Sequence, residues 1–490
     1  MRRIPAAARW CALVALANAL VWSLVTPPFH VPDETVHVAY LQHLAETGRI
    51  PNKPGATVFS AEEAGVLDAL RFNAVVGSAR DRTVSTEAQQ RGVETAERAV
   101  RSRVSGGGTA ESSSQPPLFY AYESIGYLAS PWRGLLERVW LMRLMSALLC
   151  SATVLFTYLF LRELFTSEPW AWTVGALAVA FQPLFGFTAS GITPDSLFFA
   201  ASAALLWALA RAFRHGLTPE RGAVIGAALA VGVLTKLNFL PLLPGALLGI
   251  ALLVWRERRR PALRRAMIGA AWACGIAATA AGVYVALNLL VWDRTAWGGG
   301  VGVAARTAAG TGSHAAAAVT FADQLSYTWQ LYLPRLPFMS SEFFHYPGWE
   351  TWYRGFIGEF GWLDTTFDLW VYRVSLVVTI PLVVLAAVAL WRRRATLRER
   401  LPEILTYGTL VLGILVSIGV LGLRYRRSTG FEFEQARYIL PFLPLYAAAV
   451  AAAAIGAGRR FARPVGALLV TLAAVHGLFA QLLVISRFYG

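Results

Sequence analysis

Long uninterrupted apolar runs are the feature of this sequence that most restricts its fold. A membrane-spanning helix needs about 20 predominantly apolar residues in a row, and the 490-residue chain contains many such runs. Hydrophobic residues make up 56% of the chain and charged residues 15%, whereas soluble domains carry about 25% charged residues. The sequence therefore excludes a disordered chain and argues against one or two ordinary soluble domains.

The apolar runs predict an all-α polytopic membrane protein in which residues 1–490 form a single integral membrane domain. Two long extracytoplasmic loops, 27–137 and 292–370, are expected to carry amphipathic helices that lie at the membrane surface. We expect about eleven spans, at 10–26, 139–163, 170–190, 195–213, 221–235, 239–255, 266–291, 371–391, 402–423, 438–456 and 465–486.

Clusters of arginine predict the orientation of these spans. They precede the first span and follow the fourth, sixth, eighth and tenth, as in the runs that end at Arg260 and Arg394. If the spans alternate, all clusters fall on one side, which the positive-inside rule makes cytoplasmic. We therefore expect a protein of the cytoplasmic (inner) membrane, with the N-terminus inside, the C-terminus outside and the first span retained as an anchor.

The net charge of +15 is explained by this topology and by high-GC codon usage, which favours arginine over lysine. A nucleic-acid partner is not expected, because no soluble segment concentrates the basic residues on one face. The three cysteines (Cys11, Cys150 and Cys274) fall in apolar runs, and we expect them to be small core residues and not a metal site or a disulfide framework.

The two loops are long enough to suggest a function. Each has a flexible stretch, at 104–115 and 297–318, that is either a linker or a lid that orders on substrate. Aromatic residues crowd between 321 and 372, and two interpretations stay open for them. They form a belt at the membrane surface, or a few of the rings stack on a sugar.

A short polar segment directly after the first span has the most informative chemistry. Pro27 and Pro28 end the membrane helix, Asp33 stands at the start of a new helix with Glu34 and His37 in its first turn, and Gly48 closes it. The simplest interpretation is that Asp33 caps this helix. The alternative is that Asp33, at the depth of the lipid headgroups, acts as a general base that removes a proton from a sugar or alcohol hydroxyl. A divalent metal at this cluster also stays open, although a site needs at least three ligands.

A series of short motifs, in order along nearly the whole chain, resembles the GT-C superfamily of polyprenyl-phosphate-sugar glycosyltransferases. The resemblance is closest to an uncharacterised group of predicted bacterial membrane proteins of that type. It identifies a family more specifically than an activity. The motifs are PDETVH at 32–37, QPPLFYAY at 115–122, LMRLMSALL at 141–149, ITPDSLFFA at 192–200, LTKLNFLPLLP at 234–244, WQLYLPRLPF at 329–338, FIGEFGWLD at 356–364 and EQARYILPFLPLY at 434–446.

The resemblance implies roles for particular residues. Asp33 would be the catalytic base, with Glu34 as the alternative and His37 in the same catalytic cluster. The donor would be a sugar on a polyprenyl phosphate, whose phosphate would be bound by Arg437, Tyr438, Lys236 or Arg335. Purely structural roles also remain open for these residues. Lys236 and Arg437 could be snorkelling anchors at the ends of spans, and Asp195 could be a helix cap. The candidate substrate-binding residues are Gln115, Tyr120, Asp195, Asn238, Trp329, His345 and Glu359.

Together these observations predict an inverting glycosyltransferase of the cell envelope. It would transfer a sugar from the donor to an extracytoplasmic glycan, lipid or protein acceptor, without a required cofactor. The absence of a clear DxD motif argues against a metal-dependent mechanism like that of oligosaccharyltransferases. Because the chain ends directly after the last span, we expect the loops or a partner to recognise the acceptor. A transporter or flippase of lipid-linked saccharides is the alternative, but no convincing internal repeat is apparent. A noncatalytic assembly subunit is a third possibility.

Overall fold

The fold of the protein is helical. A computed structural model describes residues 4–51, 59–77, 81, 86–98, 110–129, 133–292, 294–298, 319–343, 346–432 and 434–490. In the described chain, the strands are two short segments, β1 (Glu359–Phe360) and β2 (Thr365–Thr366), which pair antiparallel with Glu359 opposite Thr366. The predicted all-α multi-pass membrane fold is confirmed.

The described residues contain nine helices that are long and apolar enough to cross a membrane, and a bent pair makes a tenth. Each of the eleven predicted segments is helical, but α12 (Pro219–Thr235) has only 17 residues and is shorter than the other spans. The nine are α1 (Ala6–Val25), α8 (Leu135–Leu164), α11 (Asp195–His215), η1 with α13 (Leu237–Leu242 and Leu243–Arg256), α14 (Leu263–Leu290), α18 (Leu369–Arg392), α20 (Leu401–Thr429), η2 with α21 (Ala436–Phe442 and Leu443–Gly456) and α22 (Ala462–Tyr489).

Proline explains where three of the spans are broken. The predicted span 170–190 is the pair α9 (Pro169–Ala180) and α10 (Pro183–Ala189), bent by 59° at a break before Pro183. Two other spans begin as 3₁₀ turns, η1 and η2, with Pro241 and Pro441 inside them. Proline lacks an N–H and clashes with the preceding turn, so a regular α-helix is disfavoured there. The similar sequences LPLLP (240–244) and LPFLP (440–444) are where the two turns form.

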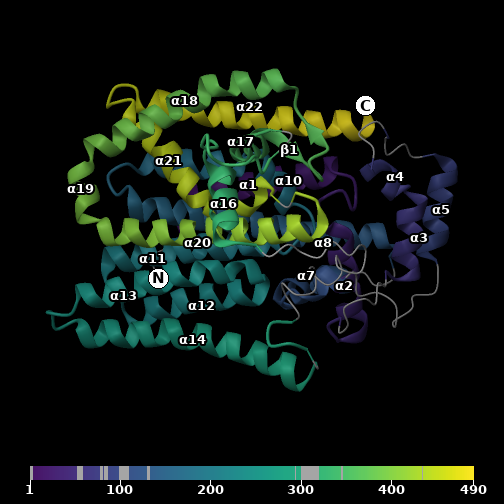
Figure 1. The fold of residues 1–490 in the computed structure, drawn as a ribbon, viewed down its shortest axis with the longest axis horizontal. Coiled ribbons are helices and arrows are strands. Elements are labelled where there is room, and N and C mark those ends of the chain that lie inside the picture. Colours follow the sequence, from purple (N-terminus) through teal and green to yellow (C-terminus); the bar gives the residue numbers. More distant parts are fainter. Residues whose placement is uncertain are drawn as a thin grey trace.

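Figure 1 shows the long helices lying roughly side by side, with α14 along one edge and α18 and α22 along the opposite edge. The side chains of α11 are largely buried, whereas α14 and α18 expose most of theirs, as expected of helices that face lipid. Cys11 and Cys150 are buried as predicted, but Cys274 is exposed on α14, so the expectation that it is a core residue was wrong. Close packing depends on small residues, since a Cβ on Gly222 of α12 would collide with the backbone of Gly269 on α14.

The predicted arginine clusters lie at one end of the helix bundle. Arg214, Arg256, Arg393 and Arg400 come from four different segments and line one cavity of about 500 Å³. Arg162, Arg211 and Arg221 border a neighbouring cavity together with Ile4 and Pro5, which places the start of the chain at this end. The shared location of the clusters agrees with an alternating topology, while the side of the membrane remains a prediction.

The helices of the first long loop lie at the other end of the bundle (Figure 1). Arg487, near the end of α22, donates a hydrogen bond of 2.9 Å to the Val75 carbonyl in this loop. The helices are α2 (Glu34–Thr47), α3 (Ala61–Ala69), α4 (Phe72–Gly77), α5 (Glu87–Glu97), α6 (Ala110–Ser113) and α7 (Leu118–Leu128). The second loop contains α16 (Phe321–Tyr332) and α17 (Gly348–Gly358), and α19 (Arg394–Glu399) connects α18 to α20.

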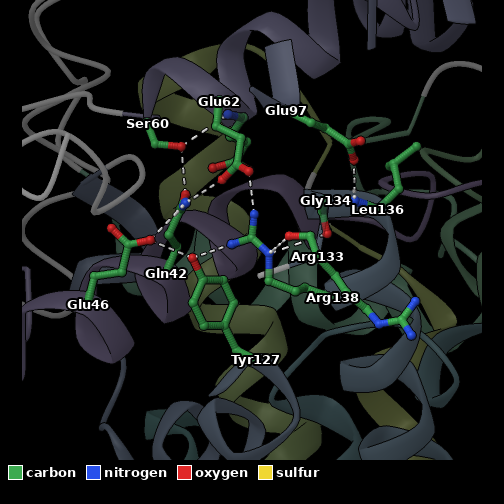
Figure 2. A network of polar contacts seen from close by, with 11 residues as sticks. Gln42, Glu46, Ser60, Glu62, Glu97, Tyr127, Arg133, Gly134, Leu136 and Arg138 are labelled. Atoms are coloured by element: carbon green, nitrogen blue, oxygen red, sulfur yellow. Dashed lines mark hydrogen bonds and ion pairs between the residues drawn. The ribbon is translucent and has the colours of Figure 1, made fainter. Parts of the chain in front are cut away.

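A buried polar network fixes the first loop to the bundle (Figure 2). Arg138, near the start of α8, forms an ion pair with Glu62 of α3 in which both side chains are fully buried. Gln42 of α2 donates to the same carboxylate at 3.0 Å and accepts from Ser60 at 2.6 Å. Because breaking a buried ion pair typically costs about 3–5 kcal/mol, this network holds α2 and α3 in one position relative to α8.

Candidate functional site

Asp33 occupies the N-cap position of α2, as its place in the sequence predicted. Its side chain, however, makes no capping hydrogen bond, and its backbone is left-handed with φ of 66°. Non-glycine residues rarely adopt this conformation, and asparagine and aspartate tolerate it best. The Asp33 carboxylate instead accepts a hydrogen bond of 2.7 Å from the Arg437 guanidinium, and 47% of the side chain remains exposed. In this structure the Asp33 carboxylate therefore does not cap the helix.

Arg437 belongs to a cluster of four alternating charges, Asp33, Arg437, Asp195 and Lys236, which we call the charge cluster. The second guanidinium nitrogen of Arg437 lies 3.9 Å from the Asp195 carboxylate. Lys236 donates to the other oxygen of Asp195 at 2.6 Å. Arg437 and Asp195 are buried, and only 11% of the Lys236 side chain is exposed. Asp33 is thus the member of the cluster that a molecule outside the bundle can reach.

The broken spans position both cations of the charge cluster. Lys236 is the last residue before η1, and Arg437 is the second residue of η2, so one stands directly before a proline-containing 3₁₀ turn and the other inside one. Asp195 is the first residue of α11. Four segments that are far apart in the sequence therefore meet at one point, and Asp33 and Arg437 are 404 residues apart.

The surrounding charges keep Asp33 ionised. Burial on its own raises the pKa of Asp33, but the positive charge of Arg437, with a smaller contribution from Lys236, lowers it to below its usual value. The neighbouring His37 is buried, and burial is the largest effect that lowers its pKa, to about 4, so the ring is neutral at pH 7. Asp33 therefore has its proton-accepting form available at neutral pH.

His37 leads from the charge cluster to a pair of stacked tyrosines. Its Nδ1 lies 2.9 Å from the hydroxyl of Tyr120 on α7, at hydrogen-bond distance. The Tyr120 ring stacks on Tyr40 of α2 with 3.7 Å between ring centroids. The Tyr40 hydroxyl donates to the backbone carbonyl of Gln115 at 3.4 Å. Two predicted substrate-binding residues, Tyr120 and Gln115, are thus next to the predicted catalytic cluster.

Glu34 faces away from Asp33, although the two are neighbours in sequence. Its two carboxylate oxygens accept hydrogen bonds of 2.8 and 2.6 Å from Arg143 of α8, and both side chains are fully buried. One of these oxygens also accepts from the Ile192 amide at 3.0 Å. Arg143 further donates to the carbonyls of Ser23, Thr26 and Pro27. Glu34 and Arg143 thus fix the turn that presents Asp33.

Two more predicted residues lie beside the cations. The Tyr438 ring lies under the Arg437 guanidinium, 5.4 Å from the ring centroid. Asn238 is half-buried in η1, two residues after Lys236. The predicted phosphate-binding role of Arg437, Tyr438 and Lys236 remains a prediction.

The residues predicted in the second loop are not brought to the charge cluster by any contact in the described chain. Trp329 donates to the Pro334 carbonyl at 2.9 Å, and the exposed Arg335 donates to the Met339 carbonyl at 2.9 Å, so both order the turn after α16. Glu359 is buried in β1, and burial raises its pKa to about 7. His345 lies outside the described residues.

The possible metal cluster does not form as the sequence suggested. Asp33 points to Arg437, and both oxygens of Glu34 are bound by Arg143, so these carboxylates and His37 do not converge on one point. Over the described ranges, no group of three or more histidine, cysteine, aspartate or glutamate side chains is arranged to hold a metal ion.

The fold defines a multi-pass membrane protein with a buried charge cluster at one end of its helices. The chain belongs to the family described as "Predicted membrane protein (DUF2142)", whose model matches residues 16–446. This confirms the expected kinship with a group of predicted membrane proteins. No curated protein matches the chain.

Solved structures to which the chain is similar are few and distant in sequence. ArnT from Cupriavidus metallidurans in the apo state has 16% identity and a TM-score of 0.44 over 92% of this chain and 60% of that chain. ArnT from the same organism, bound to undecaprenyl phosphate, has 14% identity and a TM-score of 0.44, over 98% of this chain and 76% of that chain. The archaeal oligosaccharyltransferase AglB from Archaeoglobus fulgidus, in complex with an inhibitory peptide and a dolichol-phosphate, has 14% identity and a TM-score of 0.43, over 98% of this chain and 56% of that chain.

Proposed function

We propose that the protein is a glycosyltransferase that moves a sugar from a polyprenyl-phosphate donor to an acceptor hydroxyl, with inversion at the anomeric carbon. The observation that carries this proposal is the geometry of Asp33, a half-exposed carboxylate at the edge of an otherwise buried charge cluster. The lowered pKa of Asp33 keeps it ionised, as a general base must be. The ordered motifs shared with the GT-C superfamily support the same choice of base.

The reaction needs one base and one leaving group. The acceptor hydroxyl loses its proton to Asp33 while its oxygen forms a bond to the anomeric carbon. The bond from that carbon to the phosphate oxygen breaks, and its electron pair leaves with the polyprenyl phosphate. A single displacement of this kind inverts the anomeric carbon. The acceptor is a glycan, lipid or protein of the cell envelope, and the loops at 27–137 and 292–370 would contact it on the extracytoplasmic face.

Arg437 contributes to this mechanism because it binds Asp33, the proposed base. Its hydrogen bond of 2.7 Å orients the Asp33 carboxylate, but it also makes that carboxylate a weaker base.

The alternative function is a transporter or flippase of lipid-linked saccharides. The broken spans at η1 and η2 favour it, because discontinuous helices often form the substrate site of a transporter. Transporter sites lie near the middle of the membrane. The charge cluster instead contains Asp33 of the first loop, together with the first residue of α11, and this position favours the enzyme.

The test is transfer by the purified full chain in lipid nanodiscs. The probes are a panel of radiolabelled polyprenyl-phosphate sugars, with envelope lipid and glycan extracts as acceptors. Wild type should transfer label and release polyprenyl phosphate. Asp33→Asn should reduce the rate by about a hundred- to ten-thousand-fold while it keeps its fold, because asparagine tolerates a positive φ. Asp68→Asn, at an exposed position on α3, is the matched control.

The outcome also separates the two functions. Equal rates in wild type and Asp33→Asn would refute Asp33 as the base. If wild type in vesicles moved the labelled lipid across the bilayer and never transferred its sugar, the protein would be a flippase.

A further inference from the structure

A groove of about 830 Å³ runs along α14 and is bordered by α7 and α12. Its lining is almost entirely apolar, with Pro117 just before α7, Leu118 of α7, Leu234 of α12 and a stripe of α14 from Ile268 to Leu287. No charged residue lines it. The α14 side of the groove belongs to a helix that exposes most of its surface, so the groove opens toward lipid.

The length of this groove fits an extended lipid chain. Ile268 and Leu287 are 19 positions apart, so the stripe on α14 covers about 28 Å at 1.5 Å per residue. The hydrocarbon core of a bilayer is about 30 Å thick. One apolar chain that lies along α14 can therefore stay inside the membrane over its whole length while its headgroup reaches the end near α7.

Arg294 stands at that end of the groove, in the turn after α14. Its backbone amide donates to the Asn288 carbonyl at 2.8 Å, and one guanidinium nitrogen donates to the carbonyls of Ser113 and Gly298. The other terminal nitrogen is buried and has no hydrogen-bond partner in the part of the chain that the structure describes. No acidic side chain pairs with Arg294 among these residues either. The guanidinium thus has a positive charge that the described residues do not neutralise.

The hydroxyl of Tyr284, a residue that lines the groove, borders the same space as Arg294. It is buried as well, and Asn288, one turn further along α14, is a polar side chain that interacts with it. A Cβ at Gly298 would lie 2.8 Å from this hydroxyl oxygen and 2.9 Å from Arg294 Nη2. Gly298 has φ of 73°, so both its conformation and the space require glycine. The Tyr284 hydroxyl and the Arg294 guanidinium therefore both face the backbone of Gly298, at the end of the groove.

This end of the groove adjoins the charge cluster through the stacked tyrosines. Tyr40 is bonded to the Gln115 carbonyl, two residues before the groove begins at Pro117, and it stacks on Tyr120. The charge of Arg294 acts on Tyr40, where it opposes the rise in pKa that burial causes. The hydroxyl of Tyr120 in turn contacts His37, next to Asp33.

We propose that this groove binds the polyprenyl chain of the donor, and that Arg294 and Tyr284 bind its phosphate. The proposal rests on the proposed function for the identity of the lipid. Arg437 and Lys236 can bind a phosphate only after they give up a carboxylate partner, whereas Arg294 has none to give up among the described residues. In an inverting displacement the base and the leaving group lie on opposite sides of the anomeric carbon. A phosphate site that is separate from Asp33, yet adjacent to it, meets this requirement.

The experiment measures lipid binding to the full chain in phosphatidylcholine nanodiscs by native mass spectrometry. The probes are undecaprenyl phosphate and undecaprenol, which has the same chain without the phosphate. Arg294→Gln removes the charge, and Arg294→Lys keeps it. Gly275→Leu fills the groove, because Gly275 lines it and has no atom within 4 Å of its Cβ position. Gly408→Leu on α20 is the matched control, since its Cβ position is equally open and it does not line the groove.

We expect Arg294→Gln to weaken binding of undecaprenyl phosphate about tenfold or more and to leave undecaprenol unaffected. Arg294→Lys should retain more affinity than Arg294→Gln. Gly275→Leu should weaken binding of both lipids, and Gly408→Leu should weaken neither. Unchanged affinity in Arg294→Gln or in Gly275→Leu would overturn the proposal. So would displacement of undecaprenyl phosphate by an equal amount of phosphatidylglycerol, because the groove would then be a general lipid site.

The two proposals fail separately. If wild type shows this binding pattern but never transfers a sugar, the glycosyltransferase is refuted and the groove assignment stands. If wild type transfers a sugar and Arg294→Gln binds undecaprenyl phosphate normally, only the groove assignment is refuted.

Discussion

Asp33 and Glu34 are neighbours in sequence, yet their carboxylates have different partners and different surroundings. Asp33 is half-exposed and bound to Arg437, whereas Glu34 is fully buried and bound to Arg143. The sequence predicted a functional carboxylate at this turn but could not distinguish the two. Both partners are more than 100 residues away in the chain, and local spacing has no information about such contacts. The positive φ of Asp33, which turns its carboxylate away from the helix, leaves no signal in the sequence either.

Glu34→Gln should therefore act mainly on the free energy of unfolding and not directly on sugar transfer. The change leaves the buried Arg143 with an amide in place of a carboxylate, and breaking a buried ion pair costs about 3–5 kcal/mol. We expect a loss of about 3 kcal/mol, near the lower limit, because the glutamine oxygen can still accept one hydrogen bond. The measurement is thermal unfolding of the detergent-solubilised protein. Arg133→Gln, which breaks the exposed pair with Glu137, is the control and should cost less than about 1 kcal/mol. Normal stability together with lost transfer would instead make Glu34 a candidate base.

The buried histidines of the first loop should make stability depend on pH. Burial lowers the pKa of His30 to about 3 and that of His37 to about 4, whereas an unfolded histidine titrates near 6.5. Between about pH 6.5 and 4 the unfolded chain binds protons at these positions and the folded chain does not. The free energy of unfolding therefore decreases as the pH falls through this window. The lowered pKa of Asp33 matters only at more acidic pH, below the usual aspartate range.

Unfolding temperatures measured at pH 7.5, 5.5 and 4.5 check this expectation. His37→Gln should flatten the decrease, because glutamine takes up no proton. A pH profile that is the same in wild type and His37→Gln would contradict the assignment.

At the scale of elements, the sequence predicted where the helices lie better than whether a segment is an α-helix or a 3₁₀ turn. The helix expected to run from Asp33 to Gly48 is α2, Glu34–Thr47, and Gly48 closes it in the left-handed conformation. Apolar length also located the spans that begin at η1 and η2. It could not show that each begins as a 3₁₀ turn, since hydrophobicity is the same in both kinds of helix. The paired LPLLP and LPFLP sequences were the available signal, because a proline inside an apolar run disfavours a regular α-helix there.

Pro441→Ala tests whether the 3₁₀ turn matters for function. Alanine removes the ring and restores an N–H, so the α-helix can extend toward Arg437. Arg437 would then move relative to Asp33, and small displacements of catalytic groups are costly. We expect stability within about 1 kcal/mol of wild type and transfer reduced about tenfold or more. Pro402→Ala, in the first turn of α20 at the arginine-rich end, is the control and should keep its activity. A fully active Pro441→Ala would mean that the turn has no functional role.

At the scale of the whole molecule, apolar runs and arginine clusters were sufficient to predict the architecture. Every expected span is helical, and the clusters gather at one end of the bundle because membrane helices alternate in direction. The meeting of Asp33, Asp195, Lys236 and Arg437 could not be predicted, since each residue alone fits a helix cap or a snorkelling anchor. Arg294 escaped notice for the same reason, because a single arginine after a span gives no motif. The structure brings these residues together only through packing between distant helices.

The predicted orientation of this bundle decides on which side of the membrane the proposed reaction takes place. The arginine-rich end should face the cytoplasm, because arginine-rich loops resist translocation, and the charge cluster with α2–α7 should then face outward. Reporter fusions after Arg260 and Arg394 should report a cytoplasmic location. Fusions at Ser112, and at position 314 outside the described residues, should report an external one. A donor whose sugar is presented outside the membrane can reach Asp33 only in this orientation. Cytoplasmic signals from both loop fusions would place the charge cluster inside the cell, and the proposed transfer to an extracytoplasmic acceptor would be untenable.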